Sequence, residues 1–262
     1  MINSMQMALI KKDIRSMTVN RRLFIALLIV PLIMAVVLPS VFILIIGLAP
    51  INSADLQQLL TLIPGTPDSD LRGALIQAML NGIAPMFFLI IPVMASTVMA
   101  ASSFVGEKEK QTLETLLYCP LSLRQIFIAK IIASFALSQL VSLISFAAMT
   151  LVVQAELWFI AGSWIPLGLN WLVLLLLVSP AISLVAITLI VRGSAKAKSM
   201  EESQQRSVFL IMPVLLLIVG QASGVVTVSV WLLLGIGVVC AAIGLILLRR
   251  SSANFYYERL LQ

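Results

Sequence analysis

The sequence contains no histidine, and this absence removes several kinds of chemistry. Without an imidazole there is no Ser-His triad, no histidine proton relay and no histidine ligand for a metal ion. The two cysteines, Cys119 and Cys240, stand alone without a CxxC pattern, which argues against a disulfide framework and against a zinc site. Both are expected to act as small apolar residues within helices.

Charge is scarce as well, because only 11% of the 262 residues are charged whereas 61% are hydrophobic. A soluble domain carries charge on about a quarter of its residues, so this chain has too few charges to cover a soluble surface. Disorder requires low hydrophobicity and is excluded for the same reason. We therefore expect residues 1–262 to form a single transmembrane domain, all-α and polytopic.

The few charges leave five long neutral segments, each longer than the roughly 20 apolar residues that a helix needs to cross the hydrocarbon. The last segment, between Arg206 and Arg249, has room for two helices joined by a tight turn near residues 220–224. The pattern therefore predicts six transmembrane helices. They cover about 23–49, 82–103, 126–153, 169–191, 207–225 and 229–248.

Six spans place both termini on one side of the membrane, and that side receives every lysine and arginine except Arg72. The opposite side carries the acids Asp55, Asp68, Asp70 and Glu156. Because basic residues concentrate in cytoplasmic loops, we expect a multi-pass protein of the cell (plasma) membrane with both termini cytoplasmic. The net charge of +6 reflects this bias and is no evidence for binding to nucleic acid.

Two segments outside the spans have amphipathic patterns. Within the cytoplasmic residues 1–22, a helix over 5–20 either lies on the membrane surface or serves only as a positive flank of the first span. Its apolar face is expected to contain Met7, Ile10, Ile14 and Met17. The extracytoplasmic loop 50–81 either caps the pathway or lies on the membrane surface.

No Asp, Glu, Lys or Arg lies in the middle of any predicted span, which argues against an ion-coupled carrier and against an intramembrane enzyme. Four serines of the third span fall on one helical face. They either line a translocation path or, as small residues, allow neighbouring helices to pack closely. These candidate pathway residues are Ser134, Ser138, Ser142 and Ser145.

The most informative segment is the cytoplasmic loop 104–125, between the second and third spans. Residues 107–118 are mostly good helix formers, and Pro120 ends that helix. Ser122 and Gln125 then form an S-x-x-Q capping box that starts the next helix. Lys130, one to two turns further on, is expected to extend back to the membrane interface. The pattern predicts either a short helix held rigidly between two spans or a surface-lying helix that only connects them.

This loop resembles the E-x-E-x-G-T-L-E-x-L-L-x-x-P-x-x-x-x-x-I-x-x-G-K signature of ABC-2 type permeases, the membrane subunits of one class of ABC transporters. Two positions depart from it, Gln111 at the usual glycine and Ala129 before the lysine. The matching residues are Glu107, Glu109, Thr112, Leu113, Glu114, Leu116, Leu117, Pro120, Ile126 and Lys130. The six spans and the basic amphipathic start extend the similarity over the whole chain.

The resemblance implies that the loop is a coupling helix seated in a groove of a separate ABC ATP-binding subunit. The implied ATPase-coupling residues are Glu107, Glu109, Thr112, Leu113, Glu114, Leu117, Pro120 and Arg124. The chain has no G-x-x-x-x-G-K-[ST] run, so ATP and Mg are expected on the partner. We expect that this chain is not itself an enzyme and that it has no cofactor site and no metal site.

The resulting hypothesis is the permease subunit of an ATP-driven ABC exporter, whose substrate is a drug, peptide antibiotic, lipid or sodium. A second permease chain, in a homo- or heterodimer, is expected because six spans form half of a pathway. The alternative is an ion channel or secondary carrier that works without an ATPase, in which the loop at 106–125 is dispensable. A non-transporting assembly or sensor protein is a further alternative.

Overall fold

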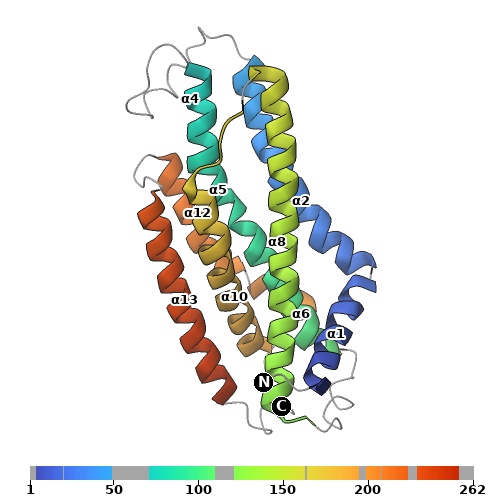
Figure 1. Ribbon diagram of the computed structural model, residues 1–262. Coiled ribbons are helices and arrows are strands. Elements are labelled where there is room, and N and C mark those ends of the chain that lie inside the picture. Colours follow the sequence, from blue (N-terminus) through green and yellow to red (C-terminus); the bar gives the residue numbers. More distant parts are fainter. Residues whose placement is uncertain are drawn as a thin grey trace.

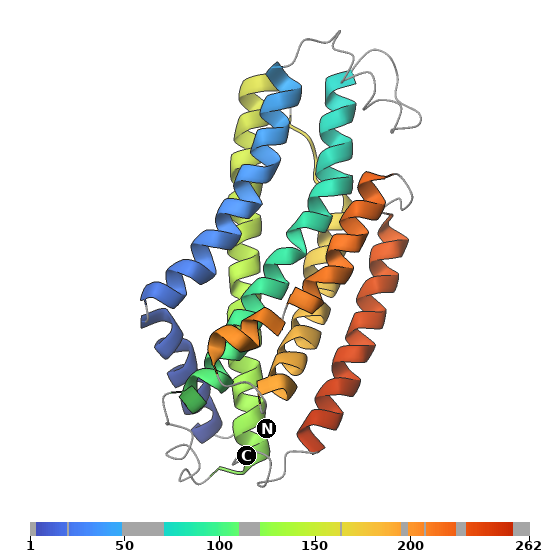
Figure 2. The ribbon, with the colours of Figure 1, turned by 180° about the vertical axis from the view of Figure 1, so that it is seen from behind.

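The computed structural model describes residues 4–19, 21–48, 71–109, 121–162, 164–194, 199–206, 208–223 and 229–253. Of these residues 94% are helical and none lies in a strand, so the predicted all-α fold is confirmed for the described part of the chain. The helices run along one elongated bundle (Figures 1 and 2).

Six helical stretches in the described residues are long and apolar enough to cross a membrane, and the predicted number of spans is thus confirmed by length and composition. The second and third stretches extend well beyond the predicted spans, and residues 71–81, expected in a loop, are helical. The six stretches are Leu27–Gly47, Gly73–Glu109, Arg124–Ile160, Leu169–Ser194, Glu202–Gln221 and Val230–Arg250.

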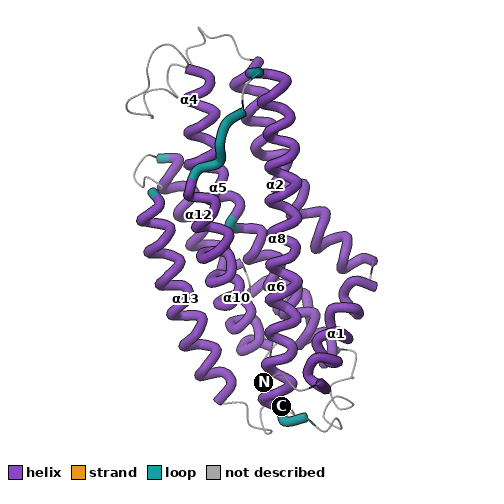
Figure 3. The backbone as a smooth tube through the Cα atoms, in the orientation of Figure 1, coloured by secondary structure: helices purple, strands orange, loops and turns teal. Residues whose placement is uncertain are grey.

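Figure 3 shows that the spans differ in regularity. The second span is interrupted, whereas the first and third are single helices. The first span is α2 (Arg21–Leu48), preceded by α1 (Ser4–Val19). The second consists of α4 (Leu71–Ala78), the π-helix η1 (Met79–Ile83), α5 (Ala84–Phe88) and α6 (Ile90–Glu109). The third is α8 (Leu123–Ala161).

The remaining helices complete the bundle. The fourth span comprises α9 (Leu169–Val173), the π-helix η2 (Leu174–Val178) and α10 (Ser179–Ser194). The fifth comprises α11 (Met200–Arg206) and α12 (Val208–Ala222), and the sixth is α13 (Val230–Ala253). Figure 1 places α1 and the last turns of α13 toward the same end of the bundle, here called the α1 end.

The 39 residues of α8 make it roughly 58 Å long, nearly twice the thickness of the hydrocarbon. Its start is the predicted capping box. The Gln125 N–H donates to Ser122 Oγ over 3.3 Å, and the Ser122 N–H donates to Gln125 Oε1 over 3.0 Å. The helix ends at Gly162, whose φ of 63° is left-handed and favours glycine. This long helix contacts α1, α2, α6 and α10.

The helix α1 forms as predicted, but its buried face differs from the predicted apolar face. Ile10 and Met17 are buried, whereas Met7 is 54% exposed. The inward stripe instead includes the polar residues Gln6 and Asp13. The reason is that α1 packs along α8 and contacts α6. This face therefore meets polar as well as apolar groups of those helices. The helix is thus an integral part of the bundle.

Candidate functional site

The signature segment joins α6 to α8 at the α1 end of the bundle (Figure 1). Glu107 and Glu109 belong to the last turn of α6, which corrects the expectation that a separate helix begins at residue 107. Arg124 lies exposed in the first turn of α8. The other predicted coupling residues lie outside the described residues. They are Thr112, Leu113, Glu114, Leu117 and Pro120.

Lys130 is buried where α1, α6 and α8 meet, with only 2% of its side chain exposed. Its Nζ lies 2.7 Å from Glu107 Oε2 and 3.4 Å from Asp13 Oδ2. It also donates to the backbone carbonyl oxygen of Ser103 over 2.7 Å. The prediction that Lys130 extends back to the interface is therefore wrong. Its ammonium points inward because two carboxylates and a carbonyl replace the water that it loses.

Further contacts complete this arrangement, which we call the Lys130 cluster (Lys130, Asp13, Glu107, Lys12 and Ser103). The Lys12 Nζ lies 3.1 Å from Glu107 Oε1, at the exposed edge of the cluster. Ser103 Oγ donates to Asp13 Oδ2 over 3.3 Å. The two carboxylates thus face two ammonium groups, and the cluster connects three helices that are distant in sequence.

Asp13 occupies the most buried carboxylate position of the cluster, with 4% of its side chain exposed. Burial raises the pKa of the Asp13 carboxyl above its usual range, and the nearby ammonium of Lys130 opposes that shift in part. The neighbouring carboxylate of Glu107 acts in the same direction as burial. The ionised form of Asp13 therefore depends on Lys130.

The burial of the Lys130 cluster determines what it costs to break it. Desolvation offsets much of the attraction within a buried ion pair, so the cluster is weak evidence for stability. Removing one partner, however, leaves the others charged, buried and uncompensated. The cluster therefore resists separation of α1, α6 and α8. Glu107 lies within one turn of the end of α6 and Lys130 lies two turns from the start of α8, so the cluster is near both described ends that flank residues 110–120.

The four serines predicted as pathway residues face the interior of the chain, each with at most 1% exposure. Ser138 Oγ donates to the Phe135 carbonyl over 2.9 Å, and Ser142 Oγ donates to the Ser138 carbonyl over 3.0 Å. This burial agrees with the packing interpretation within a single chain, and a role in lining a path stays a prediction. The four are Ser134, Ser138, Ser142 and Ser145.

Gln139, next to that stripe, joins the third and fourth spans through hydrogen bonds. Its Nε2 donates to Ser183 Oγ over 2.9 Å, and Ser179 Oγ donates to its Oε1 over 3.2 Å. Both serines of α10 are fully buried. Such side-chain bonds between helices contribute to association where the surroundings are apolar. They fix α8 against α10 near the middle of the bundle.

Sequence reasoning missed Asp13 and Ser103 as members of a site. One signal was present, because Asp13 is the only acid among the first 22 residues and stands three residues after Ile10 and four before Met17. That spacing puts the carboxylate on the buried face of a helix, where a charge needs a partner. Nothing in the local pattern indicates that the partner is Lys130, far along the chain.

These observations define a class, a helical protein with six stretches long and apolar enough to span a membrane and a buried ion cluster where α1, α6 and α8 meet. The family model of the ABC-2 type transporter matches residues 6–227, and the chain belongs to this family. It is a permease of an ABC transporter, a membrane-embedded transport subunit that is not itself catalytic. No curated protein and no solved structure matches the chain.

Proposed function

We propose that this permease is one subunit of an ATP-driven exporter and that residues 104–125 transmit movement from a separate ATP-binding subunit. The observation that carries the proposal is the Lys130 cluster. It ties the end of α6 to the start of α8 through the 2.7 Å contact between Lys130 and Glu107. Through Asp13 it also ties both helices to α1. Both described ends of the coupling segment are therefore attached to a fixed base.

A fixed base is what a coupling segment requires. If a partner displaces the segment, a loosely attached loop yields by itself and the spans stay in place. Here a displacement that separates α6 from α8 must remove a carboxylate from a buried ammonium, which is unfavourable. The displacement passes instead to the second and third spans and to α1. Export, a plasma membrane location and cytoplasmic termini form part of this proposal.

Two such chains, identical or related, complete the pathway in this proposal, and ATP with Mg binds to the partner subunits. The apolar and neutral interior of the spans favours a hydrophobic or amphipathic cargo over an ion that needs a charged partner. Drugs, peptide antibiotics and lipids have this character. Sodium export is compatible with this neutral interior only if neutral oxygen atoms bind the sodium ion.

The test is affinity purification of the tagged chain from membranes of its native cell after mild detergent extraction. We expect an ABC ATP-binding subunit with a Walker motif to co-purify, together with ATPase activity. Glu114→Arg and Leu117→Asp are expected to insert normally and to lose most of the bound ATPase, because both alter the proposed contact surface. Coupling of ATP hydrolysis to movement of the spans is lost with them.

The control is Arg250→Glu, a charge reversal of the same size at an exposed residue of α13 outside the coupling segment. It is expected to retain the ATPase. Recovery of the purified permease without any ATP-binding subunit contradicts the proposal and favours a channel or secondary carrier. Equal recovery of the ATPase with all three variants shows that contact is made elsewhere and removes the role of residues 104–125.

A further inference from the structure

The second span is irregular over a short stretch, and the irregularity has a local cause. The π-helix η1 is followed directly by α5, in which Pro85 occupies the second position. Proline has no N–H, so the carbonyl of Asn81, four residues earlier, lacks its α-helical donor. The N–H of Ala84 donates to the Met79 carbonyl in the π register. Leu80 therefore loses its usual donor as well, since its π-register donor is Pro85.

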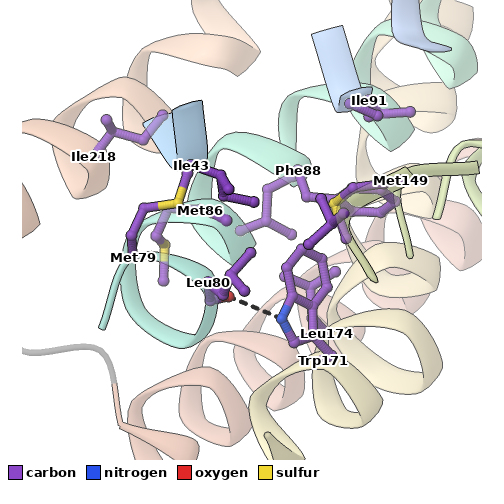
Figure 4. Packing of buried hydrophobic residues seen from close by; sticks show 14 of the residues in the cluster. Ile43, Met79, Leu80, Met86, Phe88, Ile91, Met149, Trp171, Leu174 and Ile218 are labelled. Atoms are coloured by element: carbon purple, nitrogen blue, oxygen red, sulfur yellow. Dashed lines mark hydrogen bonds between the residues drawn. The ribbon is translucent and has the colours of Figure 1, made fainter. Parts of the chain in front are cut away.

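The fourth span supplies the two missing donors. Trp171 Nε1 donates to the Leu80 carbonyl over 3.0 Å, as Figure 4 shows. Asn170 Nδ2 donates to the Asn81 carbonyl over 2.8 Å. Adjacent residues of α9 thus satisfy adjacent carbonyls of η1.

Two further observations strengthen this contact. The backbone N–H of Gly168 donates to Asn81 Oδ1 over 2.7 Å, so Asn81 is bonded through both its backbone and its side chain. Trp171 is 1% exposed and packs against Phe88 (Figure 4) and against Phe146, with ring centroids 5.5 and 5.4 Å apart. Separating the two spans would leave bare carbonyls in an apolar interior, where a carbonyl without a donor is costly.

On the other side of this contact the second span is interrupted. Leu89 lies in a single-residue turn between α5 and α6, with φ of −61° and ψ of −22°. Its N–H donates to Met86, three residues back, over 3.2 Å. A small apolar cavity lies between the second span and α2, and Leu89 itself does not line it. Its lining residues include Phe87, Phe88, Ile90 and Ile91 of the second span, Met34 and Leu38 of α2, and Met149 of α8. Pro92 has no N–H to donate to the Phe88 carbonyl, so the α-helical hydrogen bonding of the second span is weakened beside Leu89.

We infer that Asn170 and Trp171 clamp residues 79–88 to residues 168–178 as one rigid unit, and that this unit ends at a hinge at Leu89. This inference goes beyond the proposed function, because it assigns the bending point of the second span. Movement that enters α6 from the coupling segment is absorbed at Leu89. The contact of the second span with the fourth stays closed.

Hydrogen–deuterium exchange of the purified chain in lipid nanodiscs tests the clamp. Trp171→Phe keeps the aromatic packing but removes the donor to Leu80. We expect exchange to accelerate about tenfold, the effect of losing one buried hydrogen bond, in residues 79–88 and 168–178 together. Residues 90–109 are expected to be unaffected because the hinge separates them. Asn170→Leu, which removes the second donor, is expected to act on the same two segments.

The matched control is Trp231→Phe, the same substitution at a tryptophan that is 82% exposed on α13. It is expected to leave both segments unchanged. If exchange in Trp171→Phe and Asn170→Leu equals that of the control, or accelerates in only one of the two segments, no clamp exists. If the acceleration extends through residues 90–109, Leu89 is not a hinge.

A disulfide provides a rescue experiment. A Cβ placed on Gly168 lies 3.8 Å from the Asn81 Cβ, which equals the mean separation of about 3.8 Å in disulfides. In a background with Cys119 and Cys240 replaced by serine, Asn81→Cys with Gly168→Cys is expected to cross-link on oxidation. Oxidation is expected to restore slow exchange to Trp171→Phe in both segments, and reduction to abolish it. Failure of the oxidised protein to recover slow exchange overturns the clamp.

Discussion

At the scale of single residues, Lys130 has the largest expected effect, because its buried ammonium faces two carboxylates. Glu107 and Asp13 contact it from α6 and α1, at 2.7 and 3.4 Å. Without this ammonium, both carboxylates remain close together in a buried site. Loss of Asp13 instead leaves a single balanced pair of Lys130 and Glu107. Lys130 and Asp13 are therefore not equivalent within the cluster.

We expect Lys130→Met to lower the free energy of unfolding by about 3–5 kcal/mol, the usual effect of removing one partner from a buried pair. Asp13→Asn is expected to lower it less. Burial raises the pKa of Asp13, so its neutral form is already the form that folding favours. The measurement is thermal unfolding in detergent, followed as the fraction of monodisperse protein left after heating.

Lys12→Met is the control for this comparison, because Lys12 contacts the same Glu107 but is 57% exposed. An exposed ion pair contributes about 0–1 kcal/mol, so the control is expected to resemble the unmodified protein. Equal unfolding temperatures for Lys12→Met and Lys130→Met would show that the buried position of Lys130 has no energetic consequence.

The Lys130 cluster also shows which part of the site could be predicted from the sequence. The capping box at Ser122 was predictable because its two partners are three residues apart and interact within one turn. The direction of the Lys130 side chain was not, since Asp13 is 117 residues away. A pattern along one helix identifies which groups need partners, but only the packing of α1 on α8 identifies the partner.

At the scale of elements, the second span departs most from what hydrophobic periodicity predicts. The apolar pattern indicated one span at about 82–103, because such a pattern shows only where a helix is apolar. Pro85 and Pro92 are visible in the sequence, yet the donors for the carbonyls that Pro85 leaves free lie on the fourth span. The π-helix at Met79–Ile83 depends on that contact and could not be derived locally.

The contact between α13 and η2 offers a second element-scale prediction. A Cβ on Gly237 would lie 2.7 Å from Leu177 Cγ and 2.8 Å from its Cδ2, so α13 approaches closely at this point. We expect Gly237→Ala to force Leu177 away and to destabilise the protein by about 1–3 kcal/mol. Thermal unfolding in detergent measures the difference.

Gly235→Ala is the matched control, since Gly235 lies two residues away in the same helix and a Cβ there meets nothing within 4 Å. Alanine favours a helix over glycine by about 1 kcal/mol, so this variant is expected to be as stable as the unmodified protein or more so. If both substitutions change stability by the same amount, the close approach of α13 to η2 at Gly237 has no effect on stability.

At the scale of the whole molecule, the charge pattern predicted the number of spans and placed both termini on one side of the membrane. The helices alternate in direction, and α1 and the last turns of α13 lie at the same end (Figures 1 and 2). Exposed basic residues gather at this end, and in the membrane they are expected to face the cytoplasm. Lys11, Arg15, Arg192 and Arg250 are examples. Ser229, which precedes α13, lies at the opposite end of that helix.

This orientation is testable with single cysteines in a background lacking Cys119 and Cys240. We expect Ser229→Cys to react with a membrane-impermeant maleimide added to intact cells, because Ser229 is exposed and lies on the outer side in the proposed orientation. Lys11→Cys and Arg250→Cys are expected to react only after the membrane is permeabilised. The reverse pattern would place the coupling segment outside the cell, where no ATP-binding subunit could reach it. Labelling of Lys11→Cys and Arg250→Cys from opposite sides would require an odd number of spans.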